Sequence, residues 1–97
     1  MRFDILLAPE AVQDFARLRA NVRTDVRTAI ETHLRYEPRK TSRSRIKRLR
    51  GLSRPQFRLR VGDVRVFYDV VDEAVEILAI VVKLEAETWL RQFGSPG

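Results

Sequence analysis

The segment "RLRGLSRPQFRLRVGDVRVFYDV", residues 48–70, contains the signature of a β-hairpin. Two runs of alternating apolar side chains flank Gly62 and Asp63, and a glycine in a two-residue loop is typical of a primed β-turn. Such a turn fixes the register of the two strands, so Arg60 is expected opposite Arg65. The segment therefore predicts the centre of a sheet and the relative positions of its arginines.

Alternation between the two faces of each strand separates the apolar from the charged side chains of this hairpin. The face expected to join the core carries Phe57, Leu59, Val61, Val64, Val66 and Tyr68. The opposite face carries Arg58, Arg60, Arg65 and Phe67. Like charges on facing strands repel by roughly 0.2–1 kcal/mol, so strand stability does not explain the clustered arginines.

Two explanations of the arginine cluster remain open from the residues alone. Guanidinium groups match the oxygens of a phosphate, and Phe67 would then stack on a base of single-stranded nucleic acid. The alternative is an internal ion-pair network, because Asp69 and Glu76 fall on the same face in this register.

The charge of the chain is concentrated in one segment. There are 19 Lys and Arg residues against 13 Asp and Glu residues, a net charge of +6. No acidic residue lies between positions 38 and 62, whereas more than half of the basic ones do. Apolar residues such as Ile46 and Leu49 distinguish this segment from a purely solvated loop. It predicts a polyanionic partner, either nucleic acid or an acidic protein.

The composition also excludes several kinds of protein. The chain has no cysteine, which excludes disulfides, thiolate metal sites and a thiol nucleophile. No apolar stretch approaches the roughly 18 residues needed to span a membrane, and "MRFDILLAPEA" is too short and too acidic for a signal peptide. A chain of 97 residues is expected to form one domain, residues 1–97, in the cytoplasm.

Apolar periodicity predicts the other elements of the chain. We expect strands over 2–8, 46–49, 56–61, 64–71 and 74–82, and helices over 9–19, 21–36 and 85–94. The second helix should pack through an apolar stripe that recurs every four residues, Val22, Val26, Ile30 and Leu34, and the last helix through Trp89, Leu90 and Phe93. This order predicts an α+β fold, in which a small twisted antiparallel sheet is covered by an N-terminal αα-hairpin and a short C-terminal helix.

The hairpin and its surroundings resemble the RelE/ParE superfamily of toxins from bacterial type II toxin–antitoxin pairs. The hallmark of that superfamily is an "LxG…(Y/F)RLRxGDyRvxY" hairpin after two helices. The matching residues here are Leu49, Gly51, Leu52, Phe57, Arg58, Leu59, Arg60, Gly62, Asp63, Arg65, Phe67 and Tyr68. The resemblance covers nearly the whole chain and implies a microbial-RNase-like fold and an antitoxin encoded beside the toxin.

Resemblance to the RelE branch implies metal-independent cleavage of mRNA in the ribosomal A site, with no cofactor. A ribose 2′-OH attacks the adjacent phosphate, a reaction that needs stabilisation of phosphoryl charge and transfer of protons. Arg65 matches the arginine that holds the scissile phosphate, Arg58 matches a basic residue that assists it, and Arg60 shares their face. Contacts to the RNA backbone are expected from Lys47, Arg48, Arg50 and Arg54.

The proton-transfer groups are less well defined, because the sequence departs from the superfamily here. Members that cleave RNA carry an Arg or His and a Tyr just after the last strand, whereas this chain has "VKLEAETWL". Lys83 and Glu85 are the candidates that remain. Tyr68 is expected on the core face and His33 in the second helix, so neither is expected to act as an acid.

Three functions stay open at this point. The first is a ribosome-dependent mRNA endonuclease, the second is a ParE-like inhibitor of DNA gyrase, and the third is a degenerate toxin that acts only as an antitoxin-binding partner. The expected partners are the ribosome, mRNA and a cognate antitoxin with an acidic toxin-binding part, and no membrane. The "KxEAxxWL" ending, residues 83–90, resembles a subgroup paired with antitoxins of the Phd/YefM kind.

Overall fold

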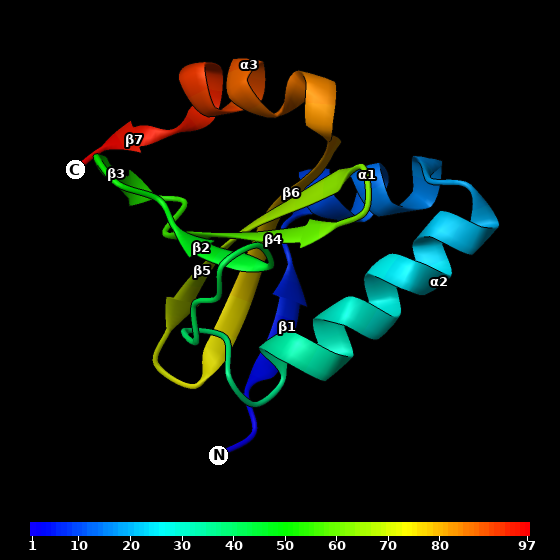
Figure 1. Cartoon of the computed structure of the whole chain (residues 1–97), viewed down its shortest axis with the longest axis horizontal. Coiled ribbons are helices and arrows are strands. Elements are labelled where there is room, and N and C mark those ends of the chain that lie inside the picture. Colours follow the sequence, from blue (N-terminus) through cyan, green and yellow to red (C-terminus); the bar gives the residue numbers. More distant parts are fainter.

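The computed structural model describes residues 1–97, which form a five-stranded sheet in the order β1-β6-β5-β4-β2 (Figure 1). Its strands are β1 (Asp4–Leu7), β2 (Ile46–Arg48), β4 (Phe57–Val61), β5 (Val64–Val71) and β6 (Ala74–Val82). The three strands β4, β5 and β6 are joined by tight turns and pair antiparallel. The predicted α+β class is confirmed.

One pairing departs from the predicted antiparallel sheet. Strand β1 runs parallel to β6, with Ile5 paired to Val75 and Leu7 paired to Ile77. The sheet is therefore mixed. Periodicity identifies a strand, but it carries no information on the direction of a partner that lies at the other end of the chain.

The N-terminal helices cover one face of the sheet. They are α1 (Pro9–Arg17) and α2 (Ala20–Ala29), and α2 continues into one turn of π-helix, η1 (Ile30–Leu34). The core formed between these helices and the sheet includes Val26, Ile30, Leu34, Leu59, Val66 and Tyr68. Both the apolar stripe of the second helix and the core face of the hairpin are thus confirmed.

The C-terminal helix α3 (Lys83–Phe93) lies on the other face and is drawn in orange at the top of Figure 1. After it, β7 (Ser95–Pro96) pairs with β3 (Leu52–Arg54) in a separate two-stranded sheet that the sequence did not predict. The Ser53 hydroxyl strengthens this junction by donating to the carbonyls of Ser95 and Pro96. None of the helices is long and apolar enough to cross a membrane.

The central hairpin has the predicted register. Arg60 pairs with Arg65 and Arg58 with Phe67 across β4 and β5, and Gly62 has φ +55° in the turn. Tyr68 lies fully buried on the core face, where its hydroxyl donates to the Pro38 carbonyl at 2.7 Å. Burial raises the pKa of this phenol above its ordinary value, so Tyr68 stays protonated and belongs to the core rather than to the opposite face of the hairpin.

Tyr68→Phe is expected to lower the free energy of unfolding by about 1–3 kcal/mol, because the buried Pro38 carbonyl loses its donor. Urea denaturation measures this as a lower midpoint with an unchanged slope. Tyr36→Phe is the matched control, since Tyr36 is 58% exposed. Equal midpoints for the two variants would contradict a structural role for the Tyr68 hydroxyl.

Candidate functional site

Four basic side chains share the face of the sheet that lies toward α3. Lys47 of β2 pairs with Arg58 of β4, and Arg60 of β4 pairs with Arg65 of β5. Paired residues on adjacent strands point to the same face. These residues, Lys47, Arg58, Arg60 and Arg65, are called the cationic face below.

Arg65 is the most buried member of the cationic face, with 8% of its surface exposed. Its Nη1 atom donates to the carbonyls of Gly62 at 2.8 Å and Val64 at 3.1 Å. These bonds fold the guanidinium back onto the hairpin turn and fix its position. No carboxylate forms an ion pair with it.

Arg58 lies half-buried next to Arg65. Its Nη2 atom donates to the Ser44 carbonyl at 3.1 Å, whereas its Nε atom is buried without a hydrogen-bond partner. Burial, followed by the positive charges of Arg65 and Arg60, lowers the pKa of Arg58 below its ordinary value. A bound anion would relieve both the unpaired donor and the crowded charge.

The acids on this face do not neutralise the cluster. Asp69 and Glu76 instead pair with Arg54, at 3.3 Å and 3.1 Å. The internal ion-pair network exists, but it involves Arg54 and leaves Arg58, Arg60 and Arg65 without acidic partners. The guanidinium of Arg54 is thus engaged within the protein, and its contact with RNA stays a prediction.

A pocket of about 520 Å³ lies between the cationic face and α3. It is lined by Leu49, Arg58, Arg65, Phe67, Lys83, Leu84, Ala86, Glu87 and Leu90. Lys83, a candidate for proton transfer, thus lines the same pocket as Arg58 and Arg65. Arg60 does not line the pocket and lies exposed at its periphery.

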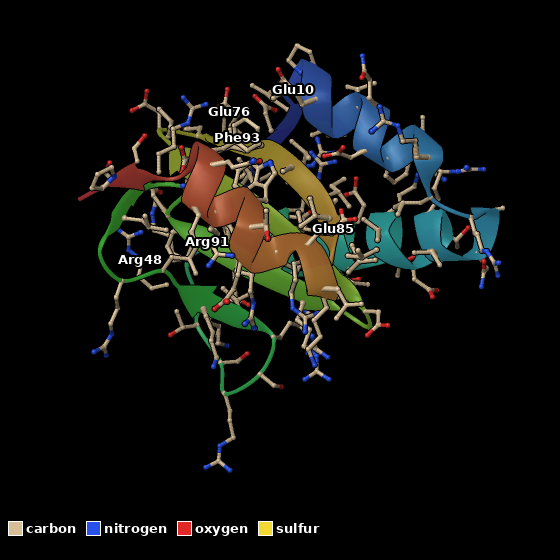
Figure 2. All side chains as sticks on the ribbon, turned by 90° about the horizontal axis from the view of Figure 1, so that it is seen from above. Glu10, Arg48, Glu76, Glu85, Arg91 and Phe93 are labelled. Atoms are coloured by element: carbon tan, nitrogen blue, oxygen red, sulfur yellow. The ribbon has the colours of Figure 1, made fainter.

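The carboxylate of this pocket belongs to Glu87 and not to Glu85. Positions two residues apart on an α-helix are rotated by about 200°, so one faces the pocket and the other faces away. Figure 2 shows Glu85 and Arg91 on opposite flanks of α3, and Arg91 lies beside Glu87. Glu85 does not line the pocket, and its role in proton transfer stays a prediction. The signal that would have found Glu87 is the 3.6-residue period counted from Lys83, which reaches Glu87 after one turn and Leu90 after two.

Phe67 is covered by α3. The ring is fully buried and stacks on Trp89, with centroids 5.1 Å apart and an interplanar angle of 4°. The Trp89 ring in turn lies against the Phe93 ring, with centroids 5.5 Å apart, although Phe93 is 62% exposed. The prediction that Phe67 stacks on a base is wrong in this conformation, because its face is occupied by Trp89.

Phe67→Ala is expected to lower the free energy of unfolding by about 3–5 kcal/mol, because it leaves a cavity beneath Trp89. Urea denaturation followed by the fluorescence of Trp89 measures the loss. Phe93→Ala is the control on the same aromatic stack and should cost less, because the Phe93 ring is mostly exposed. Unchanged stability of Phe67→Ala would show that the ring is free to serve another purpose.

The other predicted RNA contacts lie on both faces of the sheet. Lys47 and Arg50 are exposed. Arg48 points to the face opposite Lys47, since its guanidinium lies over the Phe57 ring at 5.3 Å and donates to the Gln56 carbonyl at 2.7 Å. Only Lys47 therefore joins the cationic face directly.

Arg60→Thr is expected to raise the free energy of unfolding by about 0.2–1 kcal/mol, because Arg60 repels Arg65 on the facing strand. Threonine keeps the strand propensity at an exposed position. Thermal unfolding of this variant should be compared with that of Arg43→Thr, an exposed position outside the strands. A lower melting temperature for Arg60→Thr alone would contradict the repulsion.

No group of three or more His, Cys, Asp or Glu side chains is arranged to hold a metal ion. His33 is not part of the pocket beneath α3. Burial, with a contribution from Arg45, lowers the pKa of His33 below its ordinary value. Metal-independent chemistry stays a prediction from the resemblance.

The hairpin, the two N-terminal helices and the basic pocket define a small toxin of the RelE/ParE superfamily. Residues 5–83 match the family described as the ParE toxin of the type II toxin–antitoxin system parDE, and the chain belongs to this family. The match ends at the first residue of α3. A comparison with curated proteins found no match.

Solved RelE structures share the fold. A RelE mutant from E. coli in the free state superposes with a TM-score of 0.73 at 18% identity, covering 96% of this chain and 99% of that one. RelE in the RelE–RelB complex of Pyrococcus horikoshii gives a TM-score of 0.70 at 23% identity, with coverage of 86% and 97%. The RelBE2 complex of Mycobacterium tuberculosis gives 0.68 at 24% identity, with coverage of 84% and 92%.

Proposed function

We propose that this toxin cleaves ribosome-bound mRNA in the cytoplasm and that a cognate antitoxin neutralises it. The observation that carries the proposal is the pocket beneath α3, where Arg58, Arg65 and Lys83 meet without forming an ion pair with any acid of the chain. Guanidinium groups that are held in place and form no ion pair can stabilise a phosphodiester, whose negative charge increases in the transition state.

The side chains of the pocket can be assigned to the steps of the reaction. Arg65 and Arg58 hold the non-bridging phosphoryl oxygens. The ribose 2′-OH attacks phosphorus as Glu87 accepts its proton, and the bond from phosphorus to the 5′-oxygen breaks as Lys83 donates a proton. The products are a cyclic phosphate and a 5′-hydroxyl, so atoms and charge balance.

The remainder of the cationic face supports binding of the RNA strand and the ribosome. Lys47 and Arg60 extend the positive surface beyond the pocket, and Arg50 is exposed in the turn after β2. Contacts of this kind neutralise phosphates and are weakened steeply by salt. Ribosome binding by the purified toxin should therefore fall steeply between low and physiological ionic strength.

An antitoxin partner is supported by the similar structures, three of which are toxin–antitoxin complexes of the RelBE kind. The toxin-binding part of the antitoxin is expected to be acidic, since the cationic face has no acidic partners of its own. An antitoxin of the Phd/YefM kind fits the resemblance of the C-terminal segment.

Inhibition of DNA gyrase is the second candidate function. It is favoured by the match to the ParE family and by Arg65, which is 8% exposed and already bonded to two backbone carbonyls. In this case the toxin would act through protein contacts and would leave RNA intact.

Mapping of transcript ends by primer extension after induction of the toxin separates the candidates. Cuts confined to translated codons support mRNA cleavage. Intact transcripts together with DNA breaks would select gyrase inhibition. Intact transcripts with no growth arrest would leave a protein that only binds its antitoxin.

A further inference from the structure

We propose that the pocket beneath α3 holds one whole nucleotide, with the base against an apolar wall on α3 and the phosphate against the arginines. The inference rests on the proposed function, because both use the same phosphate site. It goes further by assigning the base to particular side chains, above all Leu84.

The apolar wall is formed by side chains that the fold buries only in part or, for Leu84, hardly at all. Leu49, Leu84, Ala86 and Leu90 line the pocket from the β2–β3 turn and from α3. Leu84 is 94% exposed, the largest exposed fraction among the large apolar side chains of the chain. An apolar side chain at the rim of a pocket gains free energy when a ligand covers it.

The opposite wall suits a phosphate. It carries Arg58 and Arg65, and Lys83 stands at its end. The buried Nε atom of Arg58 has no partner within the protein. The first turn of α3 also lies here, and the positive end of a helix dipole favours an anion.

The size of the pocket favours a nucleotide over a free anion. Its volume of about 520 Å³ lies within the range of ligand pockets, about 300–1,000 Å³. A phosphate or a sugar phosphate would occupy the cationic wall and leave the leucines in water. A nucleotide covers both walls at once.

The fluorescence of Trp89 provides the assay, because it is the only tryptophan and stacks on Phe67 at the pocket. Adenosine 3′-monophosphate is compared with ribose 5-phosphate, which has the sugar and the phosphate but no base. The nucleotide is expected to bind about tenfold more tightly, the factor that burial of one leucine side chain provides.

Two variants test the apolar wall and the cationic wall of the pocket separately. Leu84→Ala should remove most of the preference for the nucleotide and leave binding of ribose 5-phosphate unchanged, whereas Arg58→Ala should weaken both ligands. Leu6→Ala is the control, since Leu6 is 55% exposed and does not line the pocket. Both Leu84 and Leu6 are surface residues, so these variants should fold.

The result that overturns the inference is equal affinity for the two ligands in the unaltered protein, absence of binding by either, or an unchanged preference in Leu84→Ala. The assay needs neither ribosome nor cleavage. If the protein prefers the nucleotide but leaves transcripts intact, the inference holds and the proposed mRNA cleavage is excluded. If the protein cuts transcripts but shows no preference for the nucleotide, the proposed cleavage holds and the inference is excluded.

Discussion

Arg65→Ala is expected to abolish growth arrest and to reduce mRNA cleavage by about 10²–10³-fold, the usual effect of removing a donor to developing charge. The fold fixes the Arg65 guanidinium through its bonds to the carbonyls of Gly62 and Val64. Cleavage of a defined transcript on purified ribosomes measures the loss directly, and growth after induction measures its consequence.

Two further variants at these positions make the result specific to the phosphate site. Arg60→Ala removes the paired arginine on the facing strand, which lies outside the pocket, so it should weaken ribosome binding without slowing the chemical step. Arg65→Lys keeps the charge and loses the two-pronged donor geometry, so an intermediate rate is expected. Full toxicity of a folded Arg65→Ala protein would exclude phosphate binding by Arg65 and favour gyrase inhibition.

The central hairpin could be predicted because its information is local. Gly62 and Asp63 set the turn, the turn sets the register, and alternation then assigns each side chain to a face. All five cross-strand pairs between β4 and β5 follow from this reasoning. The same local reasoning identified the stripe of Val26, Ile30 and Leu34, which is buried as expected.

The segments that pack on each face of the hairpin could not be predicted from local sequence in the same way. The sequence places Phe67 beside the arginines, but only the path of α3 shows that Trp89 lies on its ring. Nothing in the spacing of β3 indicates that β7 pairs with it and ties the end of α3 across the sheet. The parallel pairing of β1 with β6 has the same origin, since it depends on contacts between distant segments.

In the candidate site too, features set by neighbouring residues could be predicted, whereas features set by contacts between distant segments could not. Lys83 directly follows the last strand, so its place beside the hairpin could be inferred. The choice between Glu85 and Glu87 depends on how α3 rotates about its axis, and the docking of Trp89 on Phe67 sets that rotation. Arg54 belonged to the basic segment by charge, yet the fold brings Asp69 and Glu76 to it from β5 and β6.

Glu87→Gln is expected to reduce the rate of mRNA cleavage by about 10²–10⁴-fold, the range for loss of a general base, with little change in ribosome binding. Gln keeps the size of the side chain and the helix propensity, so the pocket should keep its shape. Single-turnover cleavage on programmed ribosomes measures the chemical step, and cosedimentation with ribosomes measures binding.

Glu85→Gln is the matched control for this experiment. It makes the same chemical change two residues earlier on α3, on a side that does not line the pocket, and it removes the same charge from the protein. A general change in electrostatic attraction to RNA would therefore alter both variants equally. A general base positioned in the pocket predicts slow cleavage by Glu87→Gln and a normal rate for Glu85→Gln. The opposite result would assign the general base to Glu85 and would require α3 to rotate by about half a turn on the ribosome.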